Sequence, residues 1–276
     1  MEIALSLLAA GFVGTADFLG GVASRRGHVF GVALWVQIVG VGALLIAAPF
    51  FEADPSAEDW LWGAVAGAGG GLGVLALYRG FAASRVGVVA PVSAVSAAAL
   101  AVLFGVVVGD RPESLDWIGI FLGVIAIALV SRVPDDHPDR PVKPGLMFGL
   151  LAGLGFAVLY IAFSRTGADS GAWPLLSARV TGSIITLGLG WLTARHLLPD
   201  RTAWKAVVAS GLCSVTGNFA FIAAAHIGLL AIVAVITSLY PAATVGLARI
   251  FFHERLSQSQ LAGLALAIAA VAVIAL

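Results

Sequence analysis

Ten apolar segments, each about as long as a membrane-spanning helix, follow one another along this chain of 276 residues. A helix needs about 20 apolar residues to cross the roughly 30 Å hydrocarbon core of a bilayer. Because the segments show no alternation of polar and apolar residues, they predict helices and not the strands of a barrel. We therefore expect an all-α membrane protein with ten transmembrane helices, at approximately 3–23, 29–50, 60–80, 86–109, 115–132, 145–165, 172–194, 204–224, 229–252 and 258–275.

The composition excludes several other classes of protein. Only 11% of the residues are charged, whereas soluble domains carry roughly 25%. The formal net charge is zero and no long basic run occurs, so no nucleic-acid partner is expected. Cys213 is the only cysteine, which excludes a disulfide framework and a cysteine-rich metal site. We predict no metal and no cofactor. The expected partners are the lipid bilayer, a small-molecule substrate and a coupled proton or other ion; the chain is a monomer or a homodimer.

The second half of the chain repeats the first at a constant shift of 144 residues. Trp60 aligns with Trp204, and Asp110–Arg111 aligns with Glu254–Arg255, without any gap. An internal repeat decides the architecture of a chain. Since each half holds five predicted helices, an odd number, the halves enter the membrane in opposite orientations. The sequence thus predicts two inverted five-helix repeats.

The boundary between the repeats lies in the longest polar connection, which is rich in proline and aspartate. We predict a first repeat at 1–133, a linker at 134–144 and a second repeat at 145–276. Inverted repeats are characteristic of secondary transporters, whose substrate site lies near the membrane midplane. The sequence therefore predicts a secondary active transporter of small molecules that works by alternating access. The alternative is a non-transporting membrane protein, such as a sensor or partner subunit, in which the duplication serves stability alone.

The end of each half carries a recurring motif. In the first half Leu77–Phe81 leads to Ala90–Pro91 and then to Gly109–Pro112; in the second half Ser238–Pro241 leads to His253–Leu256. With these motifs the chain resembles, over nearly its whole length, the EamA-like family of the drug/metabolite transporter superfamily. The resemblance implies export or exchange of amino acids, metabolites or drugs, driven by a proton gradient or another gradient.

Three positions depart from the family pattern. Ala97 stands where the repeat alignment has Pro241, Asp110 replaces the usual Glu, and His253 replaces Gly. The acidic residue and the arginine of the motif lie at a predicted helix end. These departures therefore affect which site residues of the family can be assigned to this chain more than they affect the predicted fold.

Few ionisable or amide side chains lie within the predicted helices, and each is a candidate for function because it is costly in lipid without a partner. Asp17 and Gln37 lie on one side of the expected midplane, where they are able to meet. Arg179 and Asn218 share the opposite side. We expect Asp17 to bind a cationic group or a proton and Arg179 an anionic group, so that an amino-acid-like zwitterion satisfies both. The alternative is that each is paired within the bundle or extends toward an interface.

Aromatic and proline residues add further candidates. Tyr78, Tyr160 and Tyr240 either line a substrate cavity or lie at membrane interfaces, where tyrosine is common; we count Tyr78 and Tyr240 among the substrate-binding residues. Pro91 and Pro241 each interrupt a predicted helix, because proline lacks the backbone N–H and clashes with the preceding turn. Broken helices often form the site in transporters. The alternative is a purely structural kink.

Glycine recurs at a spacing of four residues in two rows: Gly63, Gly67 and Gly71, and Gly145, Gly149 and Gly153. Glycines at this spacing form a face on which another helix approaches closely. We predict helix-packing surfaces there and not a dinucleotide-binding loop, since no soluble strand precedes the glycines.

Lys and Arg are distributed unequally between the two sets of loops. The loops after the first, third, fifth, seventh and ninth predicted helices hold most of them, and the other loops hold only Arg111 and Arg165. Because positively charged loops remain in the cytoplasm, we predict that both termini lie outside. The expected location is the cell (inner or plasma) membrane, with multiple crossings.

An enzyme is not expected. Catalysis within a membrane needs a nucleophile with a base, paired carboxylates or metal ligands in reach of one another, whereas all five histidines lie at or near predicted loops or helix ends. A channel would show rings of like charge or a selectivity filter, and the sequence has neither.

Overall fold

The structure, a computed structural model, describes residues 1–24, 29–50, 53–84, 86–132, 141–193, 197–252 and 256–276. Within these ranges every regular element is a helix. The α-helices are α1 (Glu2–Ser24), α2 (Val29–Ala47), α3 (Ala57–Ala83), α4 (Val86–Val108), α5 (Ser114–Val130), α6 (Val142–Ser164), α7 (Trp173–Thr193), α8 (Trp204–Ile227), α9 (Leu230–Thr237), α10 (Tyr240–Phe252) and α11 (Gln258–Ile274), with short 3₁₀ helices η1 (Ala48–Phe50) and η2 (Ala168–Ser170).

Seven helical segments of the described chain are long and apolar enough to cross a membrane: Glu2–Ser24, Phe30–Phe50, Ala57–Leu77, Val88–Val108, Val142–Ser164, Trp204–Ile227 and Leu230–Phe252. The helices Ser114–Val130 and Gln258–Ile274 are apolar but shorter. Each of the ten segments predicted from the sequence is helical over most of its length.

Among the differences from the predicted helix boundaries, two concern the predicted helix at 229–252 and the predicted linker. The predicted helix at 229–252 is divided into α9 and α10. α6 begins at Val142, so residues 142–144 of the predicted linker are helical; residues 133–140 of the linker region lie outside the described ranges. Pro144 is tolerated in α6 because the first turn of a helix needs no proline N–H.

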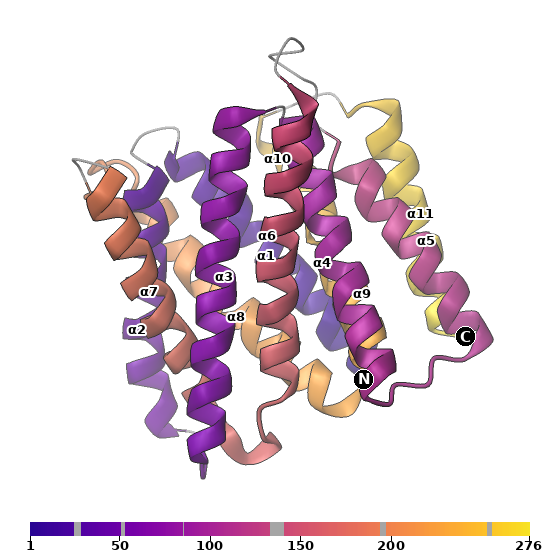
Figure 1. The fold of residues 1–276 in the computed structure, drawn as a ribbon, viewed down its shortest axis with the longest axis horizontal. Coiled ribbons are helices and arrows are strands. Elements are labelled where there is room, and N and C mark those ends of the chain that lie inside the picture. The colour runs from indigo at the N-terminus through magenta and orange to yellow at the C-terminus, as the bar shows by residue number, and fades with distance from the viewer. Residues whose placement is uncertain (25–28, 51–52, 85, 133–140, 194–196, 253–255) are drawn as a thin grey trace.

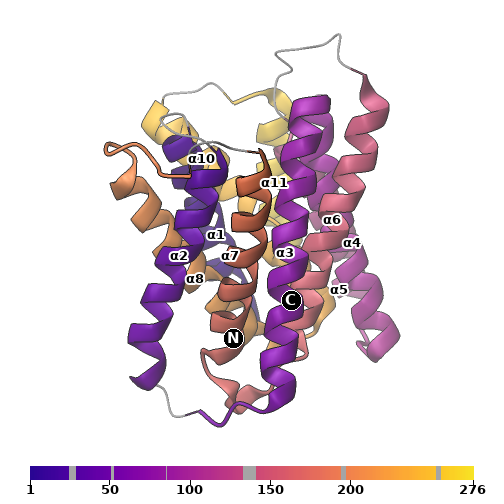
Figure 2. The same cartoon turned by 60° about the vertical axis from the view of Figure 1, so that its left-hand side comes forward.

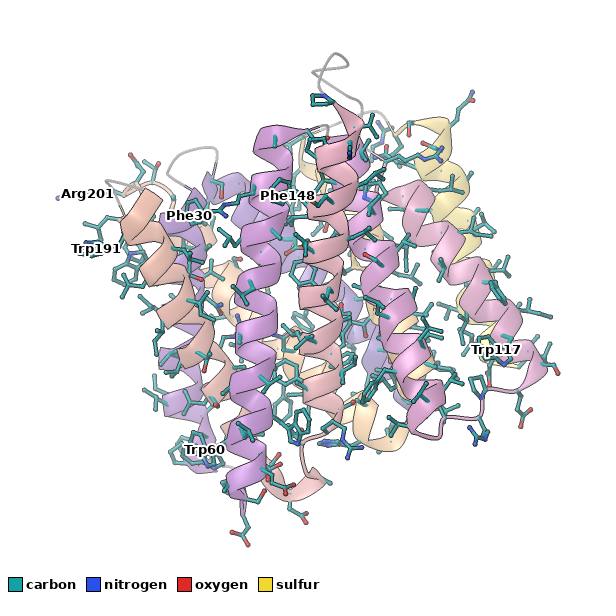
Figure 3. The ribbon with its side chains drawn as sticks, in the orientation of Figure 1. Phe30, Trp60, Trp117, Phe148, Trp191 and Arg201 are labelled. Carbon is teal, nitrogen blue, oxygen red and sulfur yellow. The ribbon has the colours of Figure 1, made fainter. Side chains whose placement is uncertain are left out.

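Both chain termini lie at one end of the bundle (Figure 1). We call the end that holds Met1 and Leu276 the terminus end, and the end that holds Ser24, Ser131 and Pro141 the linker end. Trp60 and Trp117 lie near the terminus end and Trp191 near the linker end (Figure 3). Tryptophans gathered at two levels are typical of the two interfaces of a membrane.

Helices from the two halves of the sequence pair with each other. α1 packs along α8 and α6 along α3, while α5 and α11 form a pair at one side of the bundle (Figures 1 and 2). α2 lies against α7 and α8, and α9 contacts α1, α4, α5, α6 and α8. The core of the protein therefore forms largely between the halves.

Both predicted glycine surfaces are sites of close helix contact. The row in α3 faces α7, where a Cβ added at Gly63 would meet the Pro174 carbonyl. The row in α6 faces α4, where a Cβ added at Gly153 would meet the Ser96 side chain. The prediction of helix-packing surfaces is confirmed.

The tightest crossing of α3 and α6 supplies a test of this packing. A Cβ added at Gly155 would lie 2.6 Å from the carbonyl oxygen of Gly69 and 2.7 Å from Cα of Gly73, which are backbone atoms and do not move aside. We expect Gly155→Leu to lower the free energy of unfolding by about 1–3 kcal/mol, the usual cost of overpacking, measured by denaturation of the purified protein in detergent. Gly188→Leu is the control, because a Cβ at this exposed position meets nothing within 4 Å. Equal losses in the two variants would contradict the assigned crossing.

Candidate functional site

The α-helix is interrupted between α9 and α10, where Ser238 and Leu239 form turns and the Leu239 N–H bonds to the Ile236 carbonyl, three residues earlier. Pro241 is the second residue of α10 and has no N–H to donate to the Thr237 carbonyl, four residues earlier. The chain thus has a break where Pro241 predicts one. The interruption predicted at Pro91 is not found, because α4 continues through this residue.

The position of Pro91 explains the difference. It is the sixth residue of α4, so the one carbonyl that it leaves without a donor belongs to Gly87, in the first turn of the helix. Pro241 lies instead in the middle of a segment that is long enough to span a membrane. Only the second proline divides a span into two helices.

α1 packs directly on the first turn of α10. A Cβ added at Gly14 would collide with the Tyr240 carbonyl and would lie 2.7 Å from Cβ of Ala243. The Thr244 hydroxyl donates a hydrogen bond to the Gly14 carbonyl at 3.0 Å. These contacts hold the middle of α1 beside the helix break.

Asp17 lies on the face of α1 that points into the bundle. Its neighbour Ala16 accepts a hydrogen bond from the Ser210 hydroxyl of α8 at 2.8 Å. On its other side, the ring of Phe18 lies 5.7 Å from that of Phe251 in α10. Asp17 therefore points between α8 and α10.

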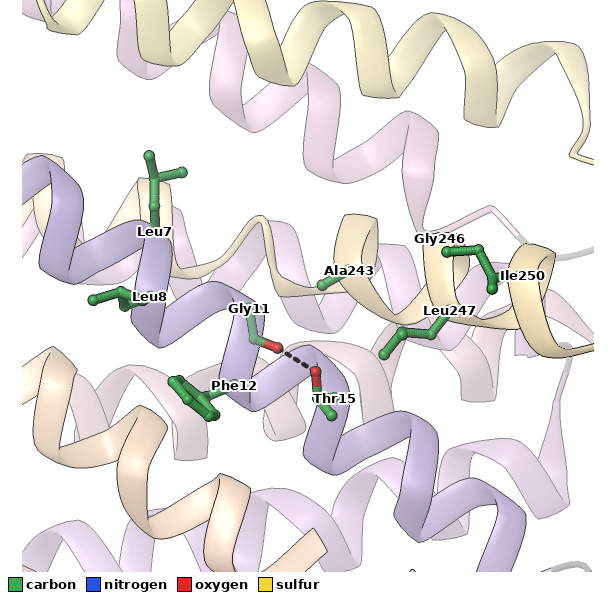
Figure 4. A pocket seen from close by; sticks show the side chains of 9 residues that line it. All are labelled: Leu7, Leu8, Gly11, Phe12, Thr15, Ala243, Gly246, Leu247 and Ile250. Atoms are coloured by element: carbon green, nitrogen blue, oxygen red, sulfur yellow. Dashed lines mark hydrogen bonds between the residues drawn. The ribbon is translucent and has the colours of Figure 1, made fainter. Parts of the chain in front are cut away.

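The outer side of α1 is marked by an apolar groove between α1 and α10 (Figure 4). The only hydroxyl among its lining residues, that of Thr15, donates to the Gly11 carbonyl at 2.7 Å. Leu8, also in the lining, is 52% exposed. Since no lining side chain offers a free polar group, we interpret the groove as a surface that faces lipid.

The inward face of α1 is accessible over only part of its length. Asp17 and Gly21 are exposed, whereas Ala10 and Gly14 are buried. These four residues share one face because they are three, four or seven positions apart. A Cβ added at Gly21 would meet nothing within 4 Å. Along this face the exposed residues therefore lie toward the linker end and the buried ones toward the terminus end.

The two helices that flank the break show the same change along the bundle axis. Every residue of α9, on the terminus side, is buried, and no residue of α10 is. α9 packs among five other helices, whereas the main contacts of α10 are with α1 and α5. α10 thus borders the part of the bundle where the inward face of α1 is exposed.

Aromatic rings and hydroxyl groups lie close to Asp17. Tyr160 of α6 is 8% exposed, and its ring stacks on that of Phe221 in α8 with centroids 4.8 Å apart. Tyr240 begins α10 beside Gly14 of α1, and α6, which carries Tyr160, contacts α9, which ends next to Ser238. We call Asp17, Tyr160, Phe221, Ser238 and Tyr240 the Asp17 site.

Phe221 places the aromatic rings relative to Asp17. A Cβ added at Gly217 of α8 would lie 2.9 Å from the Val13 side chain of α1. Phe221 is one turn further along α8, so it lies nearer to the terminus end than Asp17 does. The stacked rings of Tyr160 and Phe221 belong to the buried core on this side of Asp17.

Two buried hydroxyls at the helix break have no partner of good geometry among the described residues. The side chains of Thr237 and Ser238 are each 1% exposed, and neither oxygen is within full hydrogen-bond geometry of another group. Leaving such a group unpaired costs about 1–3 kcal/mol, and in this structure both hydroxyls are enclosed by protein.

Arg179 forms a separate polar cluster between α2, α7 and α8. It is 6% exposed and donates to Oε1 of Gln37 at 2.8 Å and to the Ser214 hydroxyl at 2.7 Å. Its Nε atom is buried without a partner. Within the described ranges no carboxylate lies in ion-pair distance of Arg179. The guanidinium therefore links the first half, through Gln37, to two helices of the second half.

The terminus end is held by carboxylates that accept backbone hydrogen bonds across the halves. Asp110 accepts the N–H of Ala231, at the start of α9, at 2.9 Å. Asp59 accepts the N–H of Gly167 at 2.6 Å. A carboxylate at the start of a helix satisfies a free N–H and complements the helix dipole, so Asp110 also stabilises the start of α9.

The predicted site residues are divided among these clusters. Asp17 and Tyr240 belong to the Asp17 site, whereas Gln37 hydrogen-bonds to Arg179 and not to Asp17. Asn218 lies one turn beyond Ser214 on the same face of α8 and makes no hydrogen bond in the described structure. The backbone of Tyr78 is in α3, but its side chain lies outside the described part of the structure.

Tyr160 was not among the residues predicted to bind substrate, although it stacks at the Asp17 site. A signal for it is present in the sequence. The shift of 144 residues aligns Asp17 with Ile161, so Tyr160 lies directly beside the position that corresponds to Asp17 in the second half.

The continuous apolar helices, the two tryptophan levels and the polar groups held inside the bundle define an all-helical membrane protein with several crossings. The sequence profile of the EamA-like transporter family matches residues 1–132 and again residues 143–276. The chain belongs to this family, whose members are membrane transporters. This confirms the resemblance to the drug/metabolite transporter superfamily.

The structure is also similar to solved ones, of which 28 chains match. One of them, described as the crystal structure of a protein, has a TM-score of 0.78 and 17% sequence identity. The similarity covers 99% of this chain and 95% of that one, and at this identity it establishes the fold alone. Among curated proteins there is no match.

Proposed function

We propose that this chain is a secondary active transporter of small molecules that works by alternating access, with ten membrane-spanning helices in two inverted repeats at 1–133 and 145–276. One observation carries the proposal. The inward face of α1 is exposed at Asp17 and Gly21 and buried at Ala10 and Gly14, and this difference along the axis supports a site that is reached from one end.

Two observations support the inverted repeats. The family profile matches the chain twice, once in each half. The helix contacts are also reciprocal: α1 packs on α8 as α6 packs on α3, and α2 on α7 and α5 on α11 are pairs of corresponding helices. If the two halves exchanged these equivalent helix contacts, so that each half adopted the conformation of the other, the linker end would close and the terminus end would open.

The loop charges supply an orientation. The positively charged loops of the sequence belong to the linker end, so the positive-inside rule places this end in the cytoplasm and both termini outside. In this orientation the exposed part of the inward face of α1 lies toward the cytoplasm. We propose the cell membrane as the location.

The roles of the polar residues follow from their places. We propose that Asp17 and Tyr240 contact the substrate, together with Tyr160, and that Gln37 and Arg179 connect the halves. Asn218 borders the Arg179 cluster, and we propose that it contacts either the substrate or the residues that connect the halves. A zwitterion that contacts Asp17 and Arg179 together would require the Arg179 hydrogen bonds to rearrange.

The proposal is tested by counterflow. Purified protein in liposomes loaded with an unlabelled amine or amino acid is diluted into a trace of the labelled compound. A carrier accumulates label transiently, because exchange is faster than net loss. Absence of counterflow for every amine and amino acid tried, with a protein that folds, would favour a non-transporting membrane protein.

The contacts at the closed end make a separate prediction. Asp110→Ala removes the acceptor for the Ala231 N–H, which costs about 0.5–2 kcal/mol at a helix start. We expect this variant to populate the form open at the terminus end more often, seen as faster labelling from that end of a cysteine placed at Ala10. Glu113→Ala is the control, since Glu113 is exposed at the same connection and is not bonded to the second half. Labelling rates that match the wild type would contradict a role for Asp110 in closure.

A further inference from the structure

We infer that His226 and Asp59 form a proton-sensitive tie that holds the terminus end of the bundle closed. The two side chains are joined through one peptide group, that of Thr166 and Gly167, in the connection between α6 and η2. This inference rests on the proposed alternating access, and it adds a means by which the pH on the terminus side regulates the opening of that end.

Both sides of this peptide group are bonded to ionisable side chains. Nε2 of His226, in the last turn of α8, lies 2.7 Å from the Thr166 carbonyl oxygen. The N–H of the same peptide group belongs to Gly167 and donates to Oδ1 of Asp59 at 2.6 Å. Thr166 and Asp59 are each 5% exposed. A peptide group that accepts on its carbonyl and donates from its N–H is polarised by both partners, so each hydrogen bond strengthens the other.

The hydrogen bonds around Thr166 decide which nitrogen of His226 titrates. Nε2 lies 2.7 Å from the Thr166 carbonyl oxygen and 3.3 Å from the Thr166 hydroxyl. The carbonyl only accepts, and the hydroxyl gives its hydrogen to the Phe163 carbonyl at 2.8 Å. Nε2 therefore carries a hydrogen in both protonation states, and Nδ1 is the nitrogen that binds or releases the proton. Protonation keeps the bond to Thr166 and makes it charge-assisted, which is the stronger kind.

The tie connects two groups of helices. α8 packs mainly on α1 and α2, whereas α6 packs mainly on α3 and α4. His226 links the end of α8 to the connection after α6, and Asp59 links this connection to the first turn of α3. Separation of α8 from α6 at the terminus end would break the bond between His226 and Thr166. Opening of this end is therefore less favourable when His226 is charged.

Most of the charged groups around the end of α8 are acidic, and they attract a positively charged imidazole. The neighbouring helices and connections bring Glu2, Asp54, Glu58, Asp59, Asp110, Arg165 and Asp169 to this end, while α2 and α9 have no charged residue and α7 has only Arg179, bonded deeper in the bundle. Glu2 is bonded to the terminal amine and Asp110 to the Ala231 N–H. Asp59 is the buried one among them, so it is the main counter-charge of the tie.

The pH dependence of cysteine labelling tests the inference. In proteoliposomes, Ala10→Cys in a Cys213→Ser background is treated from the terminus side with a membrane-impermeant maleimide at about pH 5.5 and about pH 8, a range in which histidine changes its charge. Each rate is divided by that of Glu113→Cys, at an exposed position of the same end, to cancel the ionisation of the thiol. We expect the relative rate to be at least about threefold lower at the acid pH. His226→Gln keeps an N–H donor without a titrating group, so its relative rate should not depend on pH.

Unfolding in detergent supplies a second readout that needs no transport. The stability of the wild type relative to His226→Gln should be greatest at about pH 5.5 and should shrink as the pH rises to about 8, because the charged tie exists only in the folded protein. Asp59→Asn should reduce the pH dependence of both readouts. Glu58→Gln is the matched control, since it makes the same carboxylate-to-amide change at the exposed residue beside Asp59, and it should alter neither.

The inference is overturned if the wild type is labelled at the same relative rate at both pH values, if His226→Gln shows the same fall, or if the stability difference does not depend on pH. Its failure is separable from failure of the transport function. Labelling of Ala10→Cys from the terminus side without pH dependence would reject the tie alone. No labelling at either pH, together with a stability difference that follows the pH, would support the tie and reject alternating access.

Discussion

Transport by an Asp17→Asn variant is expected to fall at least about tenfold below that of the wild type, since an uncharged amide removes the attraction for a cation in a site of low dielectric. Asp17 makes no hydrogen bond in the described structure, so the substitution breaks no contact that holds the fold. The loss should appear in counterflow by proteoliposomes, with protein yield and unfolding temperature close to those of the wild type.

The accompanying variant is Asp17→Glu, which keeps the charge and lengthens the side chain by one methylene. We expect it to retain part of the counterflow activity. Full activity of Asp17→Asn would show that the carboxylate is not needed, whereas a misfolded protein would show that Asp17 has a structural role that the described contacts do not reveal.

Arg179→Lys is expected to destabilise the protein although it keeps the charge. The guanidinium reaches Gln37 on α2 and Ser214 on α8 with separate nitrogens, whereas a lysine ammonium is a compact point charge without this fork geometry. Loss of one hydrogen bond to a charged group costs about 1.5–3 kcal/mol. We expect a loss of that size in unfolding free energy and slower transport, because the halves are less firmly connected.

A double-mutant cycle isolates this contact. If Gln37 and Arg179 act as a pair, Gln37→Leu should cost much less in an Arg179→Lys protein than in the wild type. Arg201→Lys is the control for the arginine-to-lysine change, since Arg201 is exposed (Figure 3). Additive effects of Gln37→Leu and Arg179→Lys would mean that the two residues are not coupled.

Local features of the sequence predict the fold well. Long apolar runs predict the helices, because a helix pairs its own backbone N–H and C=O groups and is therefore stable in lipid. The bounds of the helices therefore follow the polar breaks, as at Ser56, whose side chain accepts the Asp59 N–H to begin α3. The glycine spacing also predicts close helix contacts. A row of glycines has no side chains, so a neighbouring helix packs directly against the backbone of the glycine helix.

The partners of the polar side chains are less predictable. Depth in the membrane places Gln37 near Asp17, but the direction in which each helix face points decides the contact, and Gln37 points to Arg179. Asp110 lies at a helix end in the sequence, yet its acceptor role depends on the start of α9, more than a hundred residues later. Likewise Pro91 and Pro241 are the same residue type with different effects, since Pro91 is the sixth residue of its helix and Pro241 lies in the middle of a span.

Cysteine labelling from the two sides of a membrane tests the central claim of alternating access most directly. Ala10 and Gly21 lie on the inward face of α1 on opposite sides of Asp17, roughly 16 Å apart along the axis. Each is changed to cysteine in a Cys213→Ser background, which has no other cysteine, and treated with a membrane-impermeant maleimide. We predict that Gly21→Cys reacts from the linker end only and that Ala10→Cys reacts from the terminus end only, more slowly. Reaction of either cysteine from both sides, or no reaction of Ala10→Cys from any side, would contradict alternating access.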